Sequence, residues 1–314
     1  MNNKERFTSV EEIMESYKAE SYICSKQIAT TLFLAYSLGK PILVEGPVGV
    51  GKTELAKTTA KYLGSELIRL QCYEGLDESK ALYEWKYGKQ LLYTQILKDS
   101  LDKIINNASN LTEAMDKLHQ HEDVFFSPNF LEPRPLLKAL QMEEESVLLI
   151  DEVDKADEAF EAFLLEILSD FQVSIPEIGT IEAKSRPLVF LTSNNTREIS
   201  DALRRRCLHL YIPFPESQLE SDIIQVKVPD ISESLKIQLV SFIQQVRKLE
   251  IKKAPSIGET IDWAKVLLLL HIDKLSPEIV RETLSVILKF QEDVHTLDSK
   301  LDDITSKAVK ETEV

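Results

Sequence analysis

Short apolar runs alternate with longer amphipathic stretches along the first two thirds of the chain. Helical spacing of apolar residues, with capping residues in front, predicts early helices at 11–20, 25–38 and 53–63. Runs rich in aliphatic and β-branched residues predict buried strands at 41–45, 66–72, 147–151, 188–194 and 208–214. Because strands and helices alternate, the pattern predicts an α/β fold in which helices cover both faces of a parallel sheet.

The strand pattern stops after Glu216, and only helical patterns follow, at about 218–225, 231–248, 257–271, 276–292 and 295–308. We therefore predict an α/β domain over 1–215, a helical domain over 216–295 and a C-terminal helical tail over 296–314. Roughly seventy residues separate the second and third strands, which is more than one crossover helix needs. This length predicts an insertion over about 88–135, with helical spacing at 93–122 and an irregular arm at 125–135.

One octapeptide carries the clearest chemical signal, and it lies between the first predicted strand and the helix after it. Gly46-Pro-Val-Gly-Val-Gly-Lys52-Thr53 matches the phosphate-binding pattern G-x-x-x-x-G-K-[ST]. Glycines let the backbone wrap the phosphates, Lys52 reaches the β and γ oxygens, and Thr53 ligates magnesium at the helix N-terminus. We predict that a nucleotide is bound by Gly46, Pro47, Val48, Gly49, Val50, Gly51, Lys52, Thr53 and Glu54.

A second acidic element follows the third predicted strand. Four apolar residues end in Asp151, which places this carboxylate at the carboxyl end of a buried strand, where it can hold magnesium directly or through water. Glu152 comes next, and a carboxylate at that position can orient and deprotonate a water that attacks the γ-phosphate. A hydrolase needs such a base, whereas a kinase does not. The alternative interpretation is an acidic strand end that caps the following turn.

Two further polar elements lie at the ends of the later strands. Asn194 closes the fourth predicted strand and is our candidate for a group beside the γ-phosphate and the attacking water, although Asn-Asn is also a common turn dipeptide. Three arginines, Arg204 to Arg206, end a short capped helix before the fifth strand. Successive helical residues point about 100° apart, so at most one of them aims at a given target. One arginine can stabilise γ-phosphate charge in a neighbouring subunit, and surface pairing with carboxylates accounts for the others.

Composition narrows the partners and the compartment. The chain has 52 acidic and 37 basic residues, a formal net charge of −15, which disfavours nucleic acid as a partner. No apolar run approaches the roughly 20 residues of a membrane span, and the first residues lack the apolar segment of a signal peptide. Cys24, Cys72 and Cys207 are far apart, without a C-x-x-C pair, so neither a disulfide framework nor a zinc site is indicated. We expect a cytoplasmic protein.

With these residues assembled, the sequence resembles the AAA+ ATPases and, within them, the MoxR family. It is most similar to the branch that includes the carbon monoxide dehydrogenase accessory ATPase CoxD. The resemblance covers about residues 20–295 and is carried by four stretches: Leu67-Ile-Arg-Leu-Gln-Cys-Tyr-Glu-Gly-Leu-Asp77, Ala81-Leu-Tyr-Glu-Trp85, Phe163-Leu-Leu-Glu-Ile-Leu-Ser-Asp-Phe-Gln-Val173 and Asp201-Ala-Leu-Arg-Arg-Arg-Cys207. These stretches are more specific than the phosphate loop.

The resemblance implies a five-stranded AAA+ sheet, a helical lid and a hairpin at 172–183. It implies ATP and Mg²⁺ as ligands, Asn194 as the residue called sensor 1, and Arg206, with Arg205 second, as an arginine finger. It further implies hexameric rings that remodel or activate protein clients. Members are commonly found beside a partner with a von Willebrand A domain, and they are associated with the insertion of metal cofactors into metalloenzymes.

One departure from the family concerns the lid. Many relatives place an arginine near the start of a lid helix, where it contacts the γ-phosphate, but residues 255–263 of this chain contain none. Lys252 or Lys253 can substitute, or they are simply solvated. The two tryptophans, Trp85 and Trp263, are interpreted as packing residues, and two histidines in the insertion, His119 and His121, fall short of a metal site.

The sequence thus favours a ring-forming ATPase that changes the conformation or assembly of a protein client. A nucleic-acid motor or loader is the first alternative and is disfavoured by the acidic charge balance. A nucleotide-dependent binding switch with slow turnover is the second, and the presence of Glu152 disfavours it. A small-molecule kinase is the weakest alternative, because a base for water is present.

Overall fold

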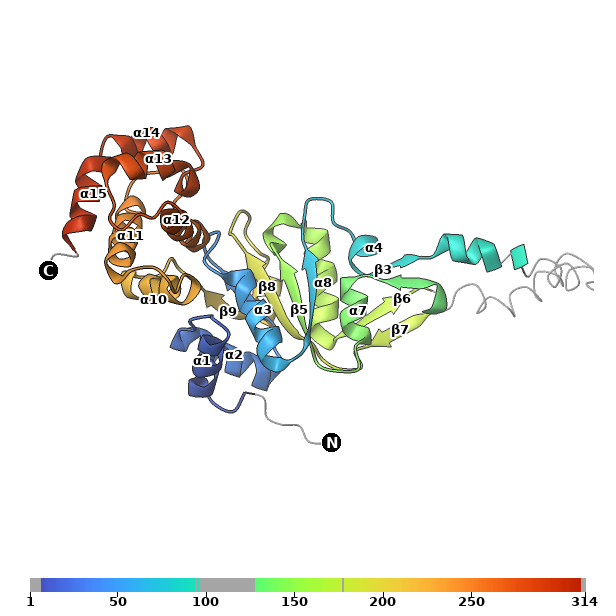
Figure 1. Ribbon diagram of the computed structural model, residues 1–314. Coiled ribbons are helices and arrows are strands. Elements are labelled where there is room, and N and C mark those ends of the chain that lie inside the picture. The colour runs from blue at the N-terminus through green and yellow to red at the C-terminus, as the bar shows by residue number, and fades with distance from the viewer. Residues whose placement is uncertain (1–6, 94, 97–127, 177, 312–314) are drawn as a thin grey trace, which may run out of the picture.

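A five-stranded parallel sheet forms the centre of the N-terminal part of the molecule (Figure 1). The computed structural model describes residues 7–93, 95–96, 128–176 and 178–311. The strands are β1 (Ile42–Glu45), β2 (Glu66–Gln71), β5 (Ser146–Asp151), β8 (Leu188–Ser193) and β9 (Leu208–Tyr211). They are ordered β2-β5-β8-β1-β9, and all four pairings are parallel. The predicted five-stranded parallel sheet is confirmed.

The register of the strands brings their carboxyl ends to one edge of the sheet. Glu45 at the end of β1 pairs with Ser193 on one side and Tyr211 on the other, and Gln71 of β2 pairs with Asp151 of β5. The residues that follow these strand ends are therefore neighbours in space, although they are far apart in sequence. This edge is where an open α/β sheet places its ligands.

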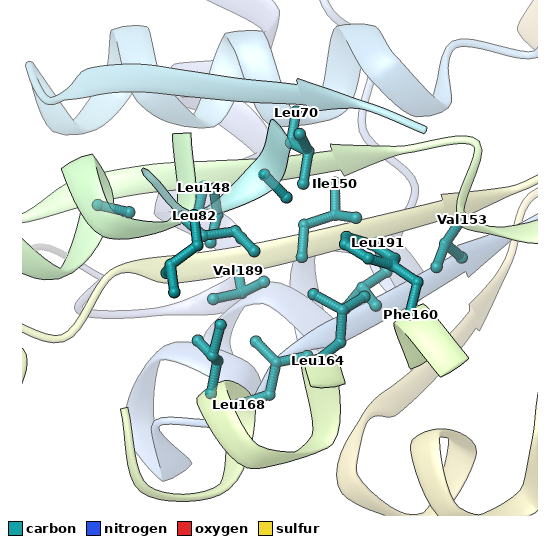
Figure 2. Packing of buried hydrophobic residues seen from close by; sticks show 14 of the residues in the cluster. Leu70, Leu82, Leu148, Ile150, Val153, Phe160, Leu164, Leu168, Val189 and Leu191 are labelled. Carbon is teal, nitrogen blue, oxygen red and sulfur yellow. The ribbon is translucent and has the colours of Figure 1, made fainter. Parts of the chain in front are cut away.

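Helices cover both faces of the sheet. One face is covered by α1 (Val10–Ala19), α2 (Lys26–Leu38) and α3 (Lys52–Leu63), and the opposite face by α7 (Pro135–Gln141), α8 (Glu158–Asp170) and α9 (Asp201–Arg206). Successive residues of β1 point to opposite faces. Ile42 and Val44 therefore belong to a first apolar cluster, on the side of α1, α2 and α3, and Leu43 belongs to a second one, on the side of α7, α8 and α9. Figure 2 shows the second cluster, where Leu164 and Leu168 of α8 lie beneath Val189 of β8.

Two small antiparallel sheets extend the domain beyond the central one. The strands β3 (Tyr83–Trp85) and β4 (Leu131–Pro133) pair after the short helix α4 (Glu78–Ala81), and β6 (Gln172–Ile175) and β7 (Gly179–Glu182) form a hairpin. Short 3₁₀ turns occupy Pro128–Phe130 (η2) and Val153–Lys155 (η3). The hairpin lies at the place that the family resemblance implied.

The prediction of an irregular arm at 125–135 is wrong for its last part. Residues 131–133 form β4, and the helix α7 begins at Pro135, because the distant strand β3 supplies backbone hydrogen-bond partners that no local pattern announces. The helical spacing predicted at 93–122 lies almost entirely outside the described residues, as do His119 and His121.

Six helices form the C-terminal part of the described chain: α10 (Ser217–Lys227), α11 (Glu233–Val246), α12 (Ile257–Leu269), α13 (Pro277–Ile287), α14 (Gln291–Asp298) and α15 (Leu301–Lys310). They share one apolar cluster and lie at one end of the molecule (Figure 1). Trp263 is fully buried in this cluster, and its indole N–H donates to Thr283, as expected of a packing residue. None of the described helices has the length and apolarity required to cross a membrane.

The helix predicted at 276–292 is shorter in the structure. It ends at Ile287, and Leu288 and Phe290 are extended, so α14 starts only at Gln291 and is separate from α15. The sequence keeps an apolar residue at the break because Leu288 is buried in the core, although its backbone is extended rather than helical. The apolar pattern of the sequence therefore looks helical at a place where the helix has ended.

Candidate nucleotide-binding site

The loop between β1 and α3 has a backbone that only glycine adopts without strain at its critical points. Gly46 and Gly49 have φ angles of 148° and 77°. A Cβ atom on Gly46 would lie 2.1 Å from the Ile212 carbonyl oxygen, and one on Gly49 would lie 2.4 Å from the Ser256 Cβ. The loop therefore packs closely against the segment after β9 and the start of α12, and its glycines are required by both contacts.

Lys52 is the first residue of α3 and is only 7% exposed. Its Nζ donates to the carbonyl oxygens of Gly46 (2.6 Å) and Pro47 (2.7 Å) and to Asn194 Oδ1 (2.7 Å). These three bonds use the full donor capacity of the ammonium group. Burial lowers the pKa of Lys52, and the carboxylates of Asp154, Asp151 and Glu152 oppose that shift. Lys52 thus ties the loop to the end of β8.

Asp151 and Thr53 are brought together as the sequence predicts. Asp151 is 3% exposed at the end of β5. Thr53 Oγ1 donates to its carboxylate, at 3.1 Å from Oδ1 and 3.3 Å from Oδ2, and Thr192 Oγ1 lies 2.5 Å from Oδ1. Adjacent ligands of an octahedral Mg²⁺, each at about 2.1 Å, lie about 3.0 Å apart. The two oxygen donors therefore fit a magnesium ion at the N-terminus of α3.

Glu152 follows with a left-handed backbone, at φ 57° and ψ 49°, and its N–H donates to Thr192 Oγ1. Asn194 Nδ2 donates to Oε1 of Glu152 at 3.3 Å. The other carboxylate oxygen accepts from Gln71 Nε2 at 3.0 Å and from Lys155 Nζ at 2.5 Å. The bond to Glu152 raises the pKa of Lys155. Glu152 is thus held between the ends of β2 and β8.

Arg69 and Gln71 of β2 belong to this cluster, and the sequence analysis missed them. Arg69 Nε and Nη2 donate to Asp151 Oδ2 at 3.1 and 2.5 Å, and Nη2 also donates to Gln71 Oε1 at 2.7 Å. The available signal was their spacing: two polar residues, two positions apart in a strand, lie on the same face, and these two lie near its carboxyl end.

Asp154 was also missed, and it supports the position of Asn194. Its Oδ2 accepts from the Asn194 N–H (3.2 Å), the Thr196 N–H (2.9 Å) and the Thr196 hydroxyl (2.6 Å). Burial alone would raise the pKa of this carboxyl group, but the hydrogen bonds from Thr196 and Asn194 hold it below its ordinary value. Asp154 therefore fixes the turn that presents Asn194.

The three arginines of α9 have different surroundings. Arg204 forms a two-pronged ion pair with Glu45, at 2.8 and 3.1 Å, and His209 Nε2 lies 2.6 Å from the same carboxylate. Arg205 and Arg206 are exposed, and Arg206 Nε donates to Ser169 at 2.5 Å. Arg206 does not join the contacts described around Lys52 and Asp151 within the chain. The guanidinium group of Arg204 is therefore engaged by a carboxylate of the same chain.

Two pockets meet at the loop. The smaller has a volume of about 270 Å³ and is lined by Val48, Gly49, Gly51, Lys52, Thr53, Glu54, Lys57, Asp151, Glu152, Thr192 and Asn194. The larger, of about 820 Å³, lies between the loop, the segments 21–28 and 211–216, and helices α10 and α12. Its walls include Tyr22, Ile212, Ile257 and Ile261. Most of the predicted nucleotide-binding residues thus line the smaller pocket, which is the more polar of the two.

The lid lysines have other partners than the loop. Lys252 Nζ lies 4.5 Å from the centre of the Phe290 ring, and Lys253 Nζ lies 3.4 Å from Glu259. The start of α12 instead reaches the loop through Ser256, which packs on Gly49. The helix therefore contacts the phosphate loop with a small polar residue.

Residues 41–207 match the family described as AAA domain (dynein-related subfamily). An uncharacterized protein of Staphylococcus haemolyticus, SH1500, is 22% identical over 251 residues, which cover 76% of this chain and 82% of that protein. Among solved structures, a mutant of Thermotoga maritima RuvB has 18% identity and a TM-score of 0.48, covering 89% of this chain and 72% of that chain.

The structure titled as the Thermotoga maritima RuvB Holliday junction branch migration motor has 17% identity and a TM-score of 0.44, covering 88% of this chain and 71% of that chain. The family match spans more than half of the present chain, from the start of β1 to the end of α9, and it includes the phosphate loop, Asp151, Glu152 and Asn194. The chain therefore belongs to the dynein-related subfamily of AAA domains and has the AAA+ P-loop fold.

Proposed function

We propose that this protein is a magnesium-dependent ATPase that hydrolyses ATP to ADP and phosphate and thereby remodels or activates a protein client. One observation supports the proposal above the others. Lys52, Thr53, Asp151, Glu152 and Asn194 come from three separate segments of the sequence, yet they line one pocket at the N-terminus of α3. A phosphate cradle, two metal ligands and a carboxylate beside a polar amide are the groups that nucleoside triphosphate hydrolysis requires.

Binding of the phosphates falls to the loop and to Lys52. The backbone of residues 46–51 and the N-terminus of α3 supply N–H groups, and Lys52 exchanges its bonds to the Gly46 and Pro47 carbonyls for phosphate oxygens. Thr53 and Asp151 hold Mg²⁺, which neutralises charge on the phosphates when it is bound. The larger pocket, with Tyr22 and Ile257 in its walls, takes the base and ribose of the nucleotide.

Hydrolysis falls to Glu152 and Asn194. The carboxylate of Glu152 accepts a proton from a water that it orients toward the γ-phosphate, and the Asn194 amide bonds both Glu152 and Lys52. Asn194 therefore links the base to the cation that contacts the phosphates. This link is the geometric reason for assigning Asn194 to the γ-phosphate side of the pocket.

The finer parts of the proposal concern assembly and client. Arg205 and Arg206 are exposed at the end of α9, so either can reach the nucleotide of an adjacent subunit in a homo-oligomeric, hexameric ring. The resemblance to the MoxR family supports a protein client, such as a von Willebrand A domain protein or a metalloenzyme whose cofactor is being inserted. The three cysteines are free and buried, which fits a reducing cytoplasm.

Two substitutions separate binding from hydrolysis. Lys52→Ala removes phosphate charge and should abolish binding of a fluorescent ATP analogue. Glu152→Gln keeps the size of the side chain and one of its two acceptor oxygens but removes the base, so it should bind the analogue normally and lose phosphate release by at least about 100-fold. Lys307→Ala, an exposed change in α15 that lines neither pocket of the loop, serves as the surface control.

Normal binding by the Lys52 variant, or retained hydrolysis by the Glu152 variant, would contradict the assigned roles. Stimulation of hydrolysis by single-stranded DNA that declines as salt rises would instead favour the nucleic-acid motor. The assay is therefore run with and without DNA at two salt concentrations, so that both functions receive a direct test.

A further inference from the structure

A cation of the chain itself contacts the carboxylate that we assign to magnesium. Arg69 reaches from β2, the edge strand, to Asp151 Oδ2 with both Nε and Nη2. The Asp151 side chain is 4% exposed, whereas that of Arg69 is 48% exposed. A buried carboxylate is unfavourable without a counter-charge, so this contact stabilises Asp151 in the absence of a metal ion. Arg69 itself remains accessible to water.

Lys52 does not take this role in the structure. Its Nζ bonds are made to Gly46, Pro47 and Asn194, and it acts on Asp151 only through the longer-range field of its charge. Among the described residues, Arg69 is the cationic side chain in hydrogen-bonding contact with Asp151. The site therefore contains a counter-ion from outside the phosphate loop.

We propose that Arg69 is the resident counter-ion of Asp151 and releases this carboxylate when magnesium and nucleotide bind. The inference rests on the proposed function, because it takes Thr53 and Asp151 as the magnesium ligands. Thr53 Oγ1 lies 3.1 Å from Oδ1 and 3.3 Å from Oδ2 of Asp151, and Arg69 donates to Oδ2, so the guanidinium group and the ion would share one carboxylate. Two cations bound to the same carboxylate repel each other, and the double charge of a magnesium ion makes its repulsion of the guanidinium group strong.

Arg69 also connects Asp151 to the proposed base. Its Nη2 donates to Gln71 Oε1, which turns the amide so that Gln71 Nε2 faces Glu152 Oε2 at 3.0 Å. When Arg69 leaves Asp151, the group that orients Gln71 moves as well. Arg69 is therefore a positioning residue, which acts on Glu152 through Gln71 and on the metal site through Asp151.

The test measures thermal stability rather than turnover. Arg69→Met keeps the length of the side chain and removes its charge, Arg69→Lys keeps the charge, and Arg281→Met removes an exposed arginine from the C-terminal helices. Each variant is melted in EDTA, and again with a non-hydrolysable ATP analogue at increasing magnesium concentrations. The readouts are the Tm in EDTA and the magnesium concentration that gives half of the rise in Tm.

The Tm of Arg69→Met in EDTA should fall by about 2–4 °C, the shift expected from the loss of about one partly exposed ion pair. Its half-saturating magnesium concentration should fall roughly fivefold, because the competing charge is gone. Arg69→Lys should stay near the wild type in both readouts, and Arg281→Met should not change the magnesium dependence. In an Asp151→Asn background, Arg69→Met should lower the Tm no further, because the partner is already lost.

An unchanged or increased magnesium requirement in Arg69→Met would overturn the proposal and make Arg69 a structural or phosphate-binding residue. A full loss of stability in the Asp151→Asn background would also overturn it. If magnesium and the analogue do not stabilise the wild-type protein at all, the proposed ATPase function fails instead, so the two failures are distinguishable.

Discussion

Asp154 illustrates how one buried side chain controls a functional neighbour. It accepts three hydrogen bonds from Asn194 and Thr196 through a single oxygen, and its other oxygen is buried without a partner among the described residues. Asp154→Asn should lower the free energy of unfolding by about 1–3 kcal/mol at neutral pH, because a charged acceptor of three donors becomes neutral.

The effect of Asp154→Asn on the free energy of unfolding should depend on pH. The pKa of Asp154 lies below its ordinary value of 3.8 in the folded protein, so its stabilisation is fully present above pH 3.8 and is lost as the pH falls through the folded value. The stability difference between wild type and Asp154→Asn should therefore shrink toward pH 3 in urea unfolding. Asp273→Asn, at an exposed position, is the control. A difference that stays constant with pH would contradict the assignment.

At this scale, the sequence predicted the residues that belong to a contiguous motif. Lys52 and Thr53 are placed by one contiguous loop, and Asp151 joins them in the pocket as expected, because the carboxyl ends of parallel strands meet at one edge of the sheet. Arg69 was missed because an arginine on an edge strand normally points to water, and its partner is 82 residues away in sequence. A side chain that acts across two neighbouring strands has no local signature.

At the scale of elements, the start of α12 is the feature that links the C-terminal helices to the phosphate loop. Ser256 and Glu259 form a reciprocal capping box, and Ser256 packs on Gly49. Ser256→Ala should lower stability by about 1 kcal/mol and weaken binding of an ATP analogue by roughly two- to fivefold, because Ile257 and Ile261 of the larger pocket lie on the first two turns of this helix.

Ser232→Ala provides a matched comparison. Ser232 caps α11 in the same way, by accepting from the N–H of Leu235, but α11 does not line either pocket of the loop. This variant should lose a similar amount of stability in urea unfolding and keep its nucleotide affinity. Equal affinities in the two variants would show that the cap of α12 has only a structural role.

Elements with strong local signals were predicted closely, and those that depend on distant partners were not. The capped helices α2 and α3 start within one residue of their predicted positions, because Ser25 and the phosphate loop mark their beginnings. The strand β4 was missed because its pairing with β3 is non-local. The break between α13 and α14 was missed because no Gly or Pro marks it, and Leu288 maintains the apolar pattern.

At the scale of the whole molecule, the arginines of α9 predict that activity belongs to subunit interfaces. Arg204 is bound to Glu45 within its own domain, which leaves Arg206, and next Arg205, for an adjacent subunit. An arginine finger contributes about 10³ to 10⁵ in rate in other systems. Arg206→Ala should therefore bind ATP and hydrolyse it poorly, and Glu152→Gln should be equally inactive while it keeps its own finger.

Mixing the two inactive variants under conditions of subunit exchange should restore part of the hydrolysis, because some interfaces then pair an intact Glu152 with an intact Arg206. An arginine that acts within its own subunit predicts no recovery. Exchange demonstrated by fluorescence energy transfer, together with a mixture that stays inactive, would contradict the ring mechanism. Full activity of a wild-type monomer would contradict it as well.

The pairing of β3 with β4 has a consequence for how such a protein acquires new tasks. Trp85 lies opposite Leu131, and the Lys86 N–H donates to the Phe130 carbonyl, so two segments that are far apart in the sequence meet at one junction. A change of length or sequence between residues 97 and 127 need not disturb the sheet or the phosphate loop, because lengthening the connection between two paired ends adds little free energy. Selection can therefore vary this segment while the sheet and the phosphate loop stay the same.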